Sequence, residues 1–91
     1  MEQFEARESK QIAWARYDAS TKILEVDFRG KNGAKASTYR YADFPPERWV
    51  QFQSAPSKGQ FFAYQIRPNY KGVKIWDAKQ AANPEPQKGL F

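Results

Sequence analysis

The chain has 91 residues and a formal charge of +5; 41% of its residues are hydrophobic and 16% aromatic, and it contains no cysteine and no histidine. This length fits one small domain, and the hydrophobic fraction suffices for a packed core, so a two-domain protein and a disordered chain are both excluded. Without cysteine or histidine the chain cannot form disulfides, catalytic triads or the usual zinc sites, and we expect a noncatalytic protein without metal or cofactor.

The first residues are charged and contain no apolar segment. Residues 1–8, MEQFEARE, are predicted to form an N-terminal extension of the domain. No part of the sequence approaches the run of about eighteen apolar residues that a membrane-spanning helix needs, and no signal peptide is recognisable. Together with the lack of cysteine, this predicts a cytoplasmic protein that has no membrane partner.

Three segments after this extension alternate polar and apolar residues, which is the pattern of β-strands. In the first segment we expect Ile12 to share a face with Trp14 and Arg16. Glycine and asparagine between residues 30 and 33 allow a tight turn before the third segment. Three strands joined by short turns predict an antiparallel meander with one apolar face and one wet face. The segments are Ile12–Tyr17, Leu24–Arg29 and Ser37–Tyr41.

Prolines bracket two short helical segments. A helix is predicted to begin near Pro46, because the missing N–H of proline would be unpaired there anyway, and to end before Pro56. A second helix begins at Ser57, whose hydroxyl can cap the first turn, and ends at Pro68. The segment Val73–Trp76 fits either a last short strand or an extended segment packed on the core.

These elements predict the α+β class, with a three-stranded antiparallel meander and two short helices packed on one face. The folded domain is expected to cover residues 9–76. Residues 77–91 contain two prolines and little apolar material before the last two positions, which is typical of a flexible tail.

The positive charge is concentrated within the domain. Residues 11–76 carry a net charge of +6, and the stretches 28–42 and 48–76 contain no acidic residue. Charge this one-sided favours an anionic partner such as RNA or single-stranded DNA, although a basic solvated surface gives the same pattern. The basic residues predicted to contact nucleic acid are Arg29, Lys31, Lys35, Arg40, Lys58, Arg67 and Lys71.

The triplet Tyr39-Arg40-Tyr41 places both tyrosine rings on one face of a strand and the guanidinium on the other. Exposed tyrosines would form a platform on which unpaired bases stack, so both are candidate nucleic-acid-binding residues. If the rings face the helices instead, they belong to the core, and Arg40 and Arg29 charge the opposite face. The sequence leaves both arrangements open.

Two weaker patterns have ordinary structural alternatives. Ser57, Lys58 and Gly59 open the second helix, where free backbone N–H groups favour an anion, but they serve equally well as a helix cap. Glu25 and Asp27 share a strand face and could hold magnesium for phosphoester chemistry, but alternating acids are also the usual outer face of a strand.

An ordered series of motifs resembles the KTSC domain, a family named for its occurrence at the C-terminus of some lysyl-tRNA synthetases. The resemblance implies a small domain that also occurs alone in bacteria and phages, with a proposed role in RNA binding and no catalytic residues to carry over. Trp49 and the longer basic turn at Lys31–Lys35 depart from the family pattern. The motifs are Ile12-Ala13, Tyr17-Asp18, Leu24-Glu25-Val26 with Phe28, Tyr39-Arg40-Tyr41, Pro45-Pro46-Glu47, Ser57-Lys58-Gly59, Phe61-Phe62 and Ile66-Arg67.

The last five residues, 87–91, resemble the short peptide that docks replication and repair proteins onto the bacterial sliding clamp. In that peptide a glutamine binds at the rim of a pocket that leucine and phenylalanine side chains fill. The resemblance implies protein-binding roles for Gln87, Leu90 and Phe91. A protein-interaction adaptor is therefore the alternative to nucleic-acid binding, unless Phe91 folds back onto the domain.

Overall fold

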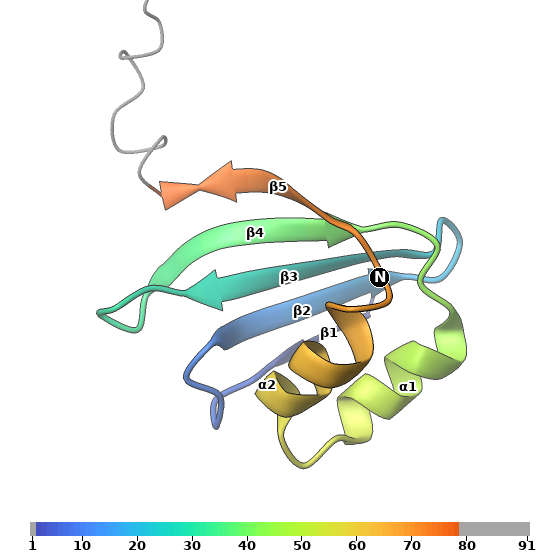
Figure 1. The fold of residues 1–91 in the computed structure, drawn as a ribbon, viewed down its shortest axis with the longest axis horizontal. Helices are drawn as coiled ribbons and strands as arrows, with labels where there is room; N and C mark the ends of the chain where they lie inside the picture. The colour runs from blue at the N-terminus through green and yellow to red at the C-terminus, as the bar shows by residue number, and fades with distance from the viewer. Residues whose placement is uncertain (1, 79–91) are drawn as a thin grey trace, which may run out of the picture.

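The computed structural model describes residues 2–78, which form a five-stranded antiparallel sheet with helices on one side (Figure 1). Every strand lies beside its neighbours in sequence, so the order is β1-β2-β3-β4-β5. The α+β class and the central meander are confirmed, and the sheet has one further strand on each side. The strands are β1 (Glu2–Glu5), β2 (Ile12–Asp18), β3 (Ile23–Arg29), β4 (Lys35–Tyr41) and β5 (Gly72–Asp77).

The first strand lies where the sequence predicts an extension. β1 pairs antiparallel with β2, with Phe4 opposite Ala15. The ring of Phe4 stacks on Trp49 with 5.3 Å between centroids and meets Phe52 edge-on at 5.1 Å. Because one aromatic residue between polar neighbours provides this packing, β1 lacks the alternation that identifies a strand from sequence.

The segment after the second helix, which the sequence left as either a short strand or an extended segment packed on the core, forms the strand β5. It pairs antiparallel with β4, with Val73 opposite Arg40 and Trp76 opposite Thr38. Its outer edge has no neighbouring strand within residues 2–78, and its hydrophobic side chains stay largely exposed. The segment is therefore an edge strand of the sheet.

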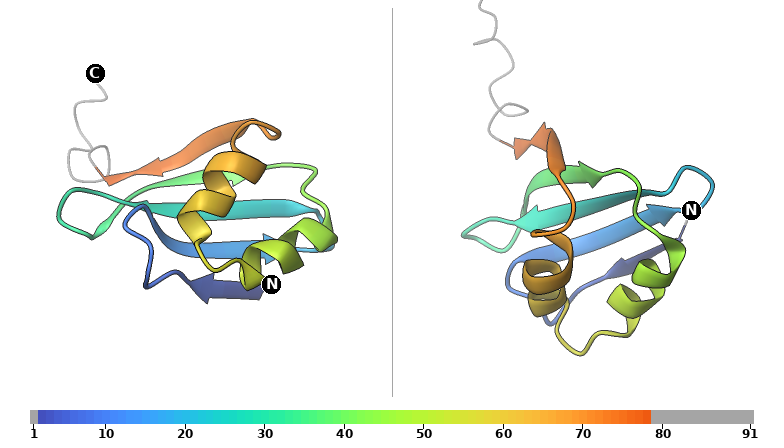
Figure 2. Two further views of the ribbon diagram at one scale, coloured as in Figure 1. Left: turned by 60° about the horizontal axis from the view of Figure 1, so that its bottom comes forward. Right: turned by 45° about the vertical axis from the view of Figure 1, so that its right-hand side comes forward.

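Both predicted helices are present, and they cover the same face of the sheet (Figure 2). Proline occupies the first helical position of α1, and the Ser57 hydroxyl accepts a hydrogen bond from the backbone N–H of Gln60 at the start of α2. No helix within residues 2–78 has the length and apolar character needed to cross a membrane. The helical elements are α1 (Pro46–Ser54), α2 (Lys58–Phe61) and the π-helical turn η1 (Phe62–Ile66) that continues α2.

The core is an aromatic layer between the sheet and the helices. Leu24 and Val26 of β3 are fully buried in it. Tyr17 stacks on Trp49 with 5.4 Å between centroids, and its hydroxyl donates a hydrogen bond to the carbonyl oxygen of Phe44. Ring contacts of this kind supply the packing that a small chain without disulfides needs.

A register shift in β2 changes which residues reach the core. The shift lies between Ile12 and Trp14. Ile12 is consequently buried with Ala15 and Tyr17, whereas Trp14 is partly exposed. The expectation that Ile12 shares a face with Trp14 and Arg16 is therefore wrong, because the extra residue of a bulge interrupts the strict alternation of a strand.

Candidate nucleic-acid interface

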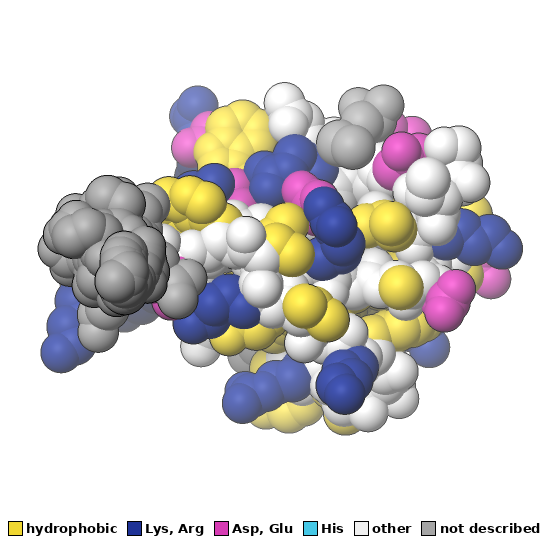
Figure 3. All heavy atoms as spheres, turned by 90° about the horizontal axis from the view of Figure 1, so that it is seen from above, with side chains coloured by type: hydrophobic (Ala, Val, Ile, Leu, Met, Phe, Trp, Pro, Cys, Tyr) yellow, Lys and Arg dark blue, Asp and Glu magenta, His cyan; other side chains and the backbone are white. Residues whose placement is uncertain are grey.

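The sheet face turned away from the helices holds a network of paired charges. Arg16 donates to both carboxylate oxygens of Asp27, at 2.9 and 2.8 Å. Arg40 donates to Glu25 at 2.9 Å, and the ammonium of Lys35 lies 3.7 Å from Asp27. Seen from the side of β5, basic, acidic and hydrophobic side chains are mixed (Figure 3). Acids therefore partner the strand cations on this face.

Two predicted nucleic-acid contacts, Lys35 and Arg40, belong to this network. The pairing of β3 with β4 places Arg40 directly opposite Glu25, and Lys35 reaches the carboxylate of Asp27. The acids come from a different strand, so the stretch around Arg40 is free of acids in sequence but not in space. The prediction that Lys35 and Arg40 join one unneutralised basic surface is therefore wrong.

Glu25 and Asp27 share a face, as alternation predicts, but their carboxylates are bonded to arginines rather than open to a metal. Burial alone would raise the pKa of Asp27, but hydrogen bonds from Arg16 and Thr38 outweigh it and lower the pKa. No group of three or more potential metal-ligating residues occurs in the described part of the chain. The arrangement is a structural ion-pair network and gives no support to magnesium-dependent chemistry.

Two further predicted contacts, Lys58 and Lys31, also lie apart from a common site. Lys58 donates to the carbonyl oxygen of Ala55 at 2.6 Å, and its ammonium lies 5.5 Å from the centre of the Phe4 ring. It therefore stabilises the connection between α1 and α2. Lys31 is exposed in the turn between β3 and β4.

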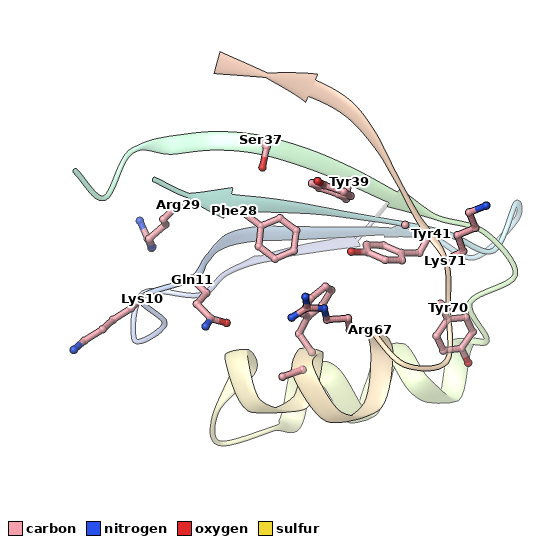
Figure 4. Close-up of a pocket in the computed structure, with 13 residues that line it drawn as sticks. Lys10, Gln11, Phe28, Arg29, Ser37, Tyr39, Tyr41, Arg67, Tyr70 and Lys71 are labelled. Carbon is pink, nitrogen blue, oxygen red and sulfur yellow. The ribbon is translucent and has the colours of Figure 1, made fainter. Parts of the chain in front are cut away.

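A cleft of about 640 Å³ opens between the helix-covered face of β3 and β4 on one side and η1 on the other (Figure 4). Residues just before β2 and just before β5 line its two ends. Its lining contains four basic side chains and no acidic one, and we call it the basic cleft. Five of the nine predicted nucleic-acid-binding residues line it, namely Arg29, Tyr39, Tyr41, Arg67 and Lys71.

Arg29 lines the basic cleft instead of joining Arg40 on the opposite face. A register shift between Phe28 and Arg29 interrupts the alternation of β3 at this point. The Arg29 guanidinium donates to three backbone carbonyl oxygens, at 3.1, 3.1 and 3.2 Å. These bonds fix its position without neutralising its charge, since a carbonyl carries no formal charge, and two of its five N–H donors remain available.

The other three cations of the basic cleft, Lys10, Arg67 and Lys71, are exposed. None of them forms an ion pair or a side-chain hydrogen bond with the described residues 2–78. Their charges therefore act on the cleft without local neutralisation. An anion entering the cleft would meet positive charge along its whole length.

Both tyrosines of the Tyr39-Arg40-Tyr41 triplet face the helices. Tyr41 is 4% exposed and packs edge-on against Phe62 at 5.7 Å, while Tyr39 is half-buried and packs edge-on against Phe28 at 5.6 Å. Both tyrosines nonetheless line the basic cleft. The rings thus face the helices and pack in or against the core, as in the second arrangement inferred from the sequence, and they also line the cleft; they do not form an exposed platform on the sheet.

The hydroxyl of Tyr41 supplies a hydrogen-bond donor to the basic cleft. Burial and the neighbouring Tyr39 raise its pKa to about 12, although Arg67 opposes the shift. The hydroxyl is therefore protonated near neutral pH, and it has no hydrogen-bond partner among the described residues. Gly72 leaves the space that the Tyr41 ring occupies, since a Cβ atom at residue 72 would lie only 2.6 Å from Cε2 of Tyr41.

Sequence reasoning did not predict eight of the residues that line the basic cleft, namely Lys10, Gln11, Phe28, Ser37, Phe62, Ala63, Tyr70 and Gly72. Lys10 follows a segment with three glutamates in sequence, and Phe28 carries no charge that would mark it as a binding residue. The available signal was the antiparallel pairing itself, because it places the start of β2 beside the end of β3.

Gln87, Leu90 and Phe91, the residues of the clamp-binding prediction, lie outside the described residues. Docking through the C-terminal segment therefore stays a prediction.

This chain is similar to a known protein family in sequence and to a solved structure in fold. The family model of the KTSC domain matches residues 8–70. A protein from Tsukamurella paurometabola is 32% identical over 68 residues, which cover 75% of this chain and 94% of that protein. A crystal structure of a KTSC domain protein from Yersinia pestis matches with a TM-score of 0.69 and 32% identity, covering 82% of this chain and 97% of the other. The chain belongs to the KTSC domain family.

Proposed function

We propose that this protein is a noncatalytic module that binds RNA or another single-stranded nucleic acid in the basic cleft. The observation that carries the proposal is the composition of the cleft wall, in which four cations and the rings of Phe28, Tyr39 and Tyr41 line one space without any acid. Cations hold phosphates, and aromatic rings stack on bases. The two kinds of group lie together here, whereas the opposite face of the sheet pairs its cations with acids.

Single strands suit this cleft better than duplexes. In a duplex the bases are paired and stacked on one another, so their faces are not available to a protein ring. Phe28 and Tyr39 lie in the wall of a recessed cleft, and an unpaired base can enter it to reach them. Tyr39 is half-buried, which leaves part of its ring accessible.

Fluorescence anisotropy with labelled RNA and single-stranded DNA, titrated with the full 91-residue chain, tests the proposal. Three or four phosphate contacts predict a slope of log affinity against log salt of about −2 to −3, from about −0.7 per contact on single strands. A duplex of the same length should bind more weakly. Absence of binding at low salt, or affinity that does not change with salt, would refute the proposal.

Substitutions that each remove one positive charge, inside or outside the basic cleft, test whether the cleft is the binding site. Arg67→Gln and Lys71→Gln should each weaken binding several-fold and reduce the salt slope by about 0.7, because each removes one phosphate contact. Lys31→Gln is the matched control, since it removes the same charge from an exposed turn outside the cleft. An equal loss in all three variants would show that net charge, and not the cleft, attracts the nucleic acid.

A further inference from the structure

The cations of the basic cleft are distributed along its length. Lys10 and Arg29 lie at the end of the sheet where β3 finishes, and Lys71 lies at the opposite end, beside the last residue of β4 (Figure 4). Arg67 lies between them, on the helical side of the cleft. A single phosphate group could contact one of these three positions but could not reach all of them.

The pairing of the strands gives the separation of the two ends. Arg29 lies opposite Lys35, at the start of β4, and Gly72, next to Lys71, lies opposite Tyr41, at its end. Six residue steps separate Lys35 from Tyr41, which at about 3.3 Å per residue is about 20 Å. A stacked strand advances about 3.4 Å per nucleotide, so this distance corresponds to about six stacked nucleotides or to fewer in an extended strand.

The aromatic groups lie between the two charged ends. Tyr39 is two residues before the end of β4, and its ring packs against Phe28. The Tyr41 hydroxyl and the Arg67 guanidinium face the same part of the cleft from opposite walls (Figure 4). A neutral donor and a cation placed this way match the several acceptor oxygens of one phosphate.

From this arrangement we infer that a single strand lies lengthwise in the basic cleft, alongside β4. Its outer phosphates contact Lys10 and Arg29 at one end and Lys71 at the other, and Arg67 and the Tyr41 hydroxyl hold a middle phosphate. A base next to this phosphate packs against Tyr39. The inference rests on the proposed function, and it adds a path along β4, a site size of about four to six nucleotides and separate roles for the residues.

A length series tests the lengthwise path. Oligouridines and oligothymidines of two to ten nucleotides compete with a labelled strand for the full-length protein, and RNA and DNA form separate arms. Affinity should rise steeply up to about six nucleotides and then level off, because longer strands find no further contact in the cleft. A dinucleotide that binds as tightly as a hexanucleotide would overturn the lengthwise path.

Substitutions at the two ends make the test specific. Lys10→Gln and Lys71→Gln should each weaken a hexanucleotide several-fold, and their effects should add because the residues lie far apart. A dinucleotide can bind at the intact end instead, so each single substitution should lower the affinity for a dinucleotide by no more than about twofold. The control is again Lys31→Gln, which should leave the affinity for both oligonucleotide lengths unchanged. Equal losses for the two lengths would contradict the path.

Tyr41→Phe separates the hydroxyl from the ring. The variant keeps the packing of the ring against Phe62 and Gly72, so its unfolding midpoint should equal that of the wild type, while its affinity for a hexanucleotide falls several-fold. Unchanged affinity would remove Tyr41 from the inference. If a hexanucleotide binds but neither end variant weakens it, the lengthwise path fails and the proposed function stands. If no oligonucleotide binds, the proposed function itself fails.

Discussion

The replacement Asp27→Asn probes the charge network on the sheet face opposite the basic cleft. Asp27 is 3% exposed and accepts hydrogen bonds from Arg16 at 2.9 and 2.8 Å and from Thr38 at 2.6 Å. Asparagine has nearly the same shape, but it has no charge and presents an NH₂ group where one carboxylate oxygen stood. The variant therefore leaves the Arg16 guanidinium facing a donor.

The expected loss of stability follows from the burial of the two partners. Removing one partner of a buried ion pair costs about 3–5 kcal/mol. The side chain of Arg16 is 22% exposed and retains Glu25 at 3.4 Å, so part of its charge stays solvated and paired. We therefore expect Asp27→Asn to lower the free energy of unfolding by about 2–3 kcal/mol, which corresponds to a fall in Tm of about 10–20 °C for a domain of this size.

Urea unfolding at pH 7 and at several lower pH values measures this loss. The folded-state pKa of Asp27 lies below its unfolded value of about 3.9. The stabilisation by ionised Asp27 is thus complete above that unfolded value and is lost as the pH falls through the folded-state pKa. Because asparagine does not titrate, the stability difference between wild type and variant should be constant near pH 7 and shrink below pH about 4.

Glu25→Gln is the matched control for Asp27→Asn. The Glu25 side chain is 22% exposed, and its partner Arg40 is 48% exposed, so this substitution should cost less than about 1 kcal/mol. A loss below about 0.5 kcal/mol for Asp27→Asn would refute the reasoning from burial. A stability difference that persists unchanged at pH 2 would refute the assignment of the pH dependence to Asp27.

Three further predictions concern packing and hydrogen bonds. Gly72→Ala places a methyl group against the ring of Tyr41, so it should cost about 1–3 kcal/mol in urea unfolding and also weaken oligonucleotide binding; wild-type stability would contradict the close approach. Tyr17→Phe removes the donor to the buried carbonyl of Phe44 and should cost about 1–3 kcal/mol, measured by thermal unfolding. Ser57→Ala removes the side-chain cap of α2 and should lower stability by about 1 kcal/mol without changing affinity, and a loss of affinity would place Ser57 in the binding site.

The strong local patterns predicted most of the fold. The alternation of Leu24, Val26 and Phe28 identified β3, and the prolines around α1 identified both ends of that helix. β1 escaped detection because its packing rests on Phe4 alone, within a charged segment. Its position at the sheet edge depends on a contact with α1, more than forty residues away in sequence, which no local pattern encodes.

The candidate site was harder to predict than the fold because charge pairing acts across strands. Lys35 and Arg40 lie in a stretch free of acids, yet β3 supplies a carboxylate to each. Lys10 follows a segment with three glutamates in sequence, yet it lines the basic cleft. In both cases the neighbours that decide the electrostatics are neighbours in space.

Sequence alone determined the elements, the family resemblance and the excess of positive charge, because these depend on residue types and on spacings of a few residues. Tertiary structure decided which cations keep their charge unneutralised, since strand register gives Lys35 and Arg40 carboxylate partners and leaves Arg29 in the basic cleft. It also decided that the Tyr39 and Tyr41 rings contribute both to the core and to the cleft wall, because Phe28 of β3 packs against Tyr39 and Phe62 of η1 packs against Tyr41 beside the cleft.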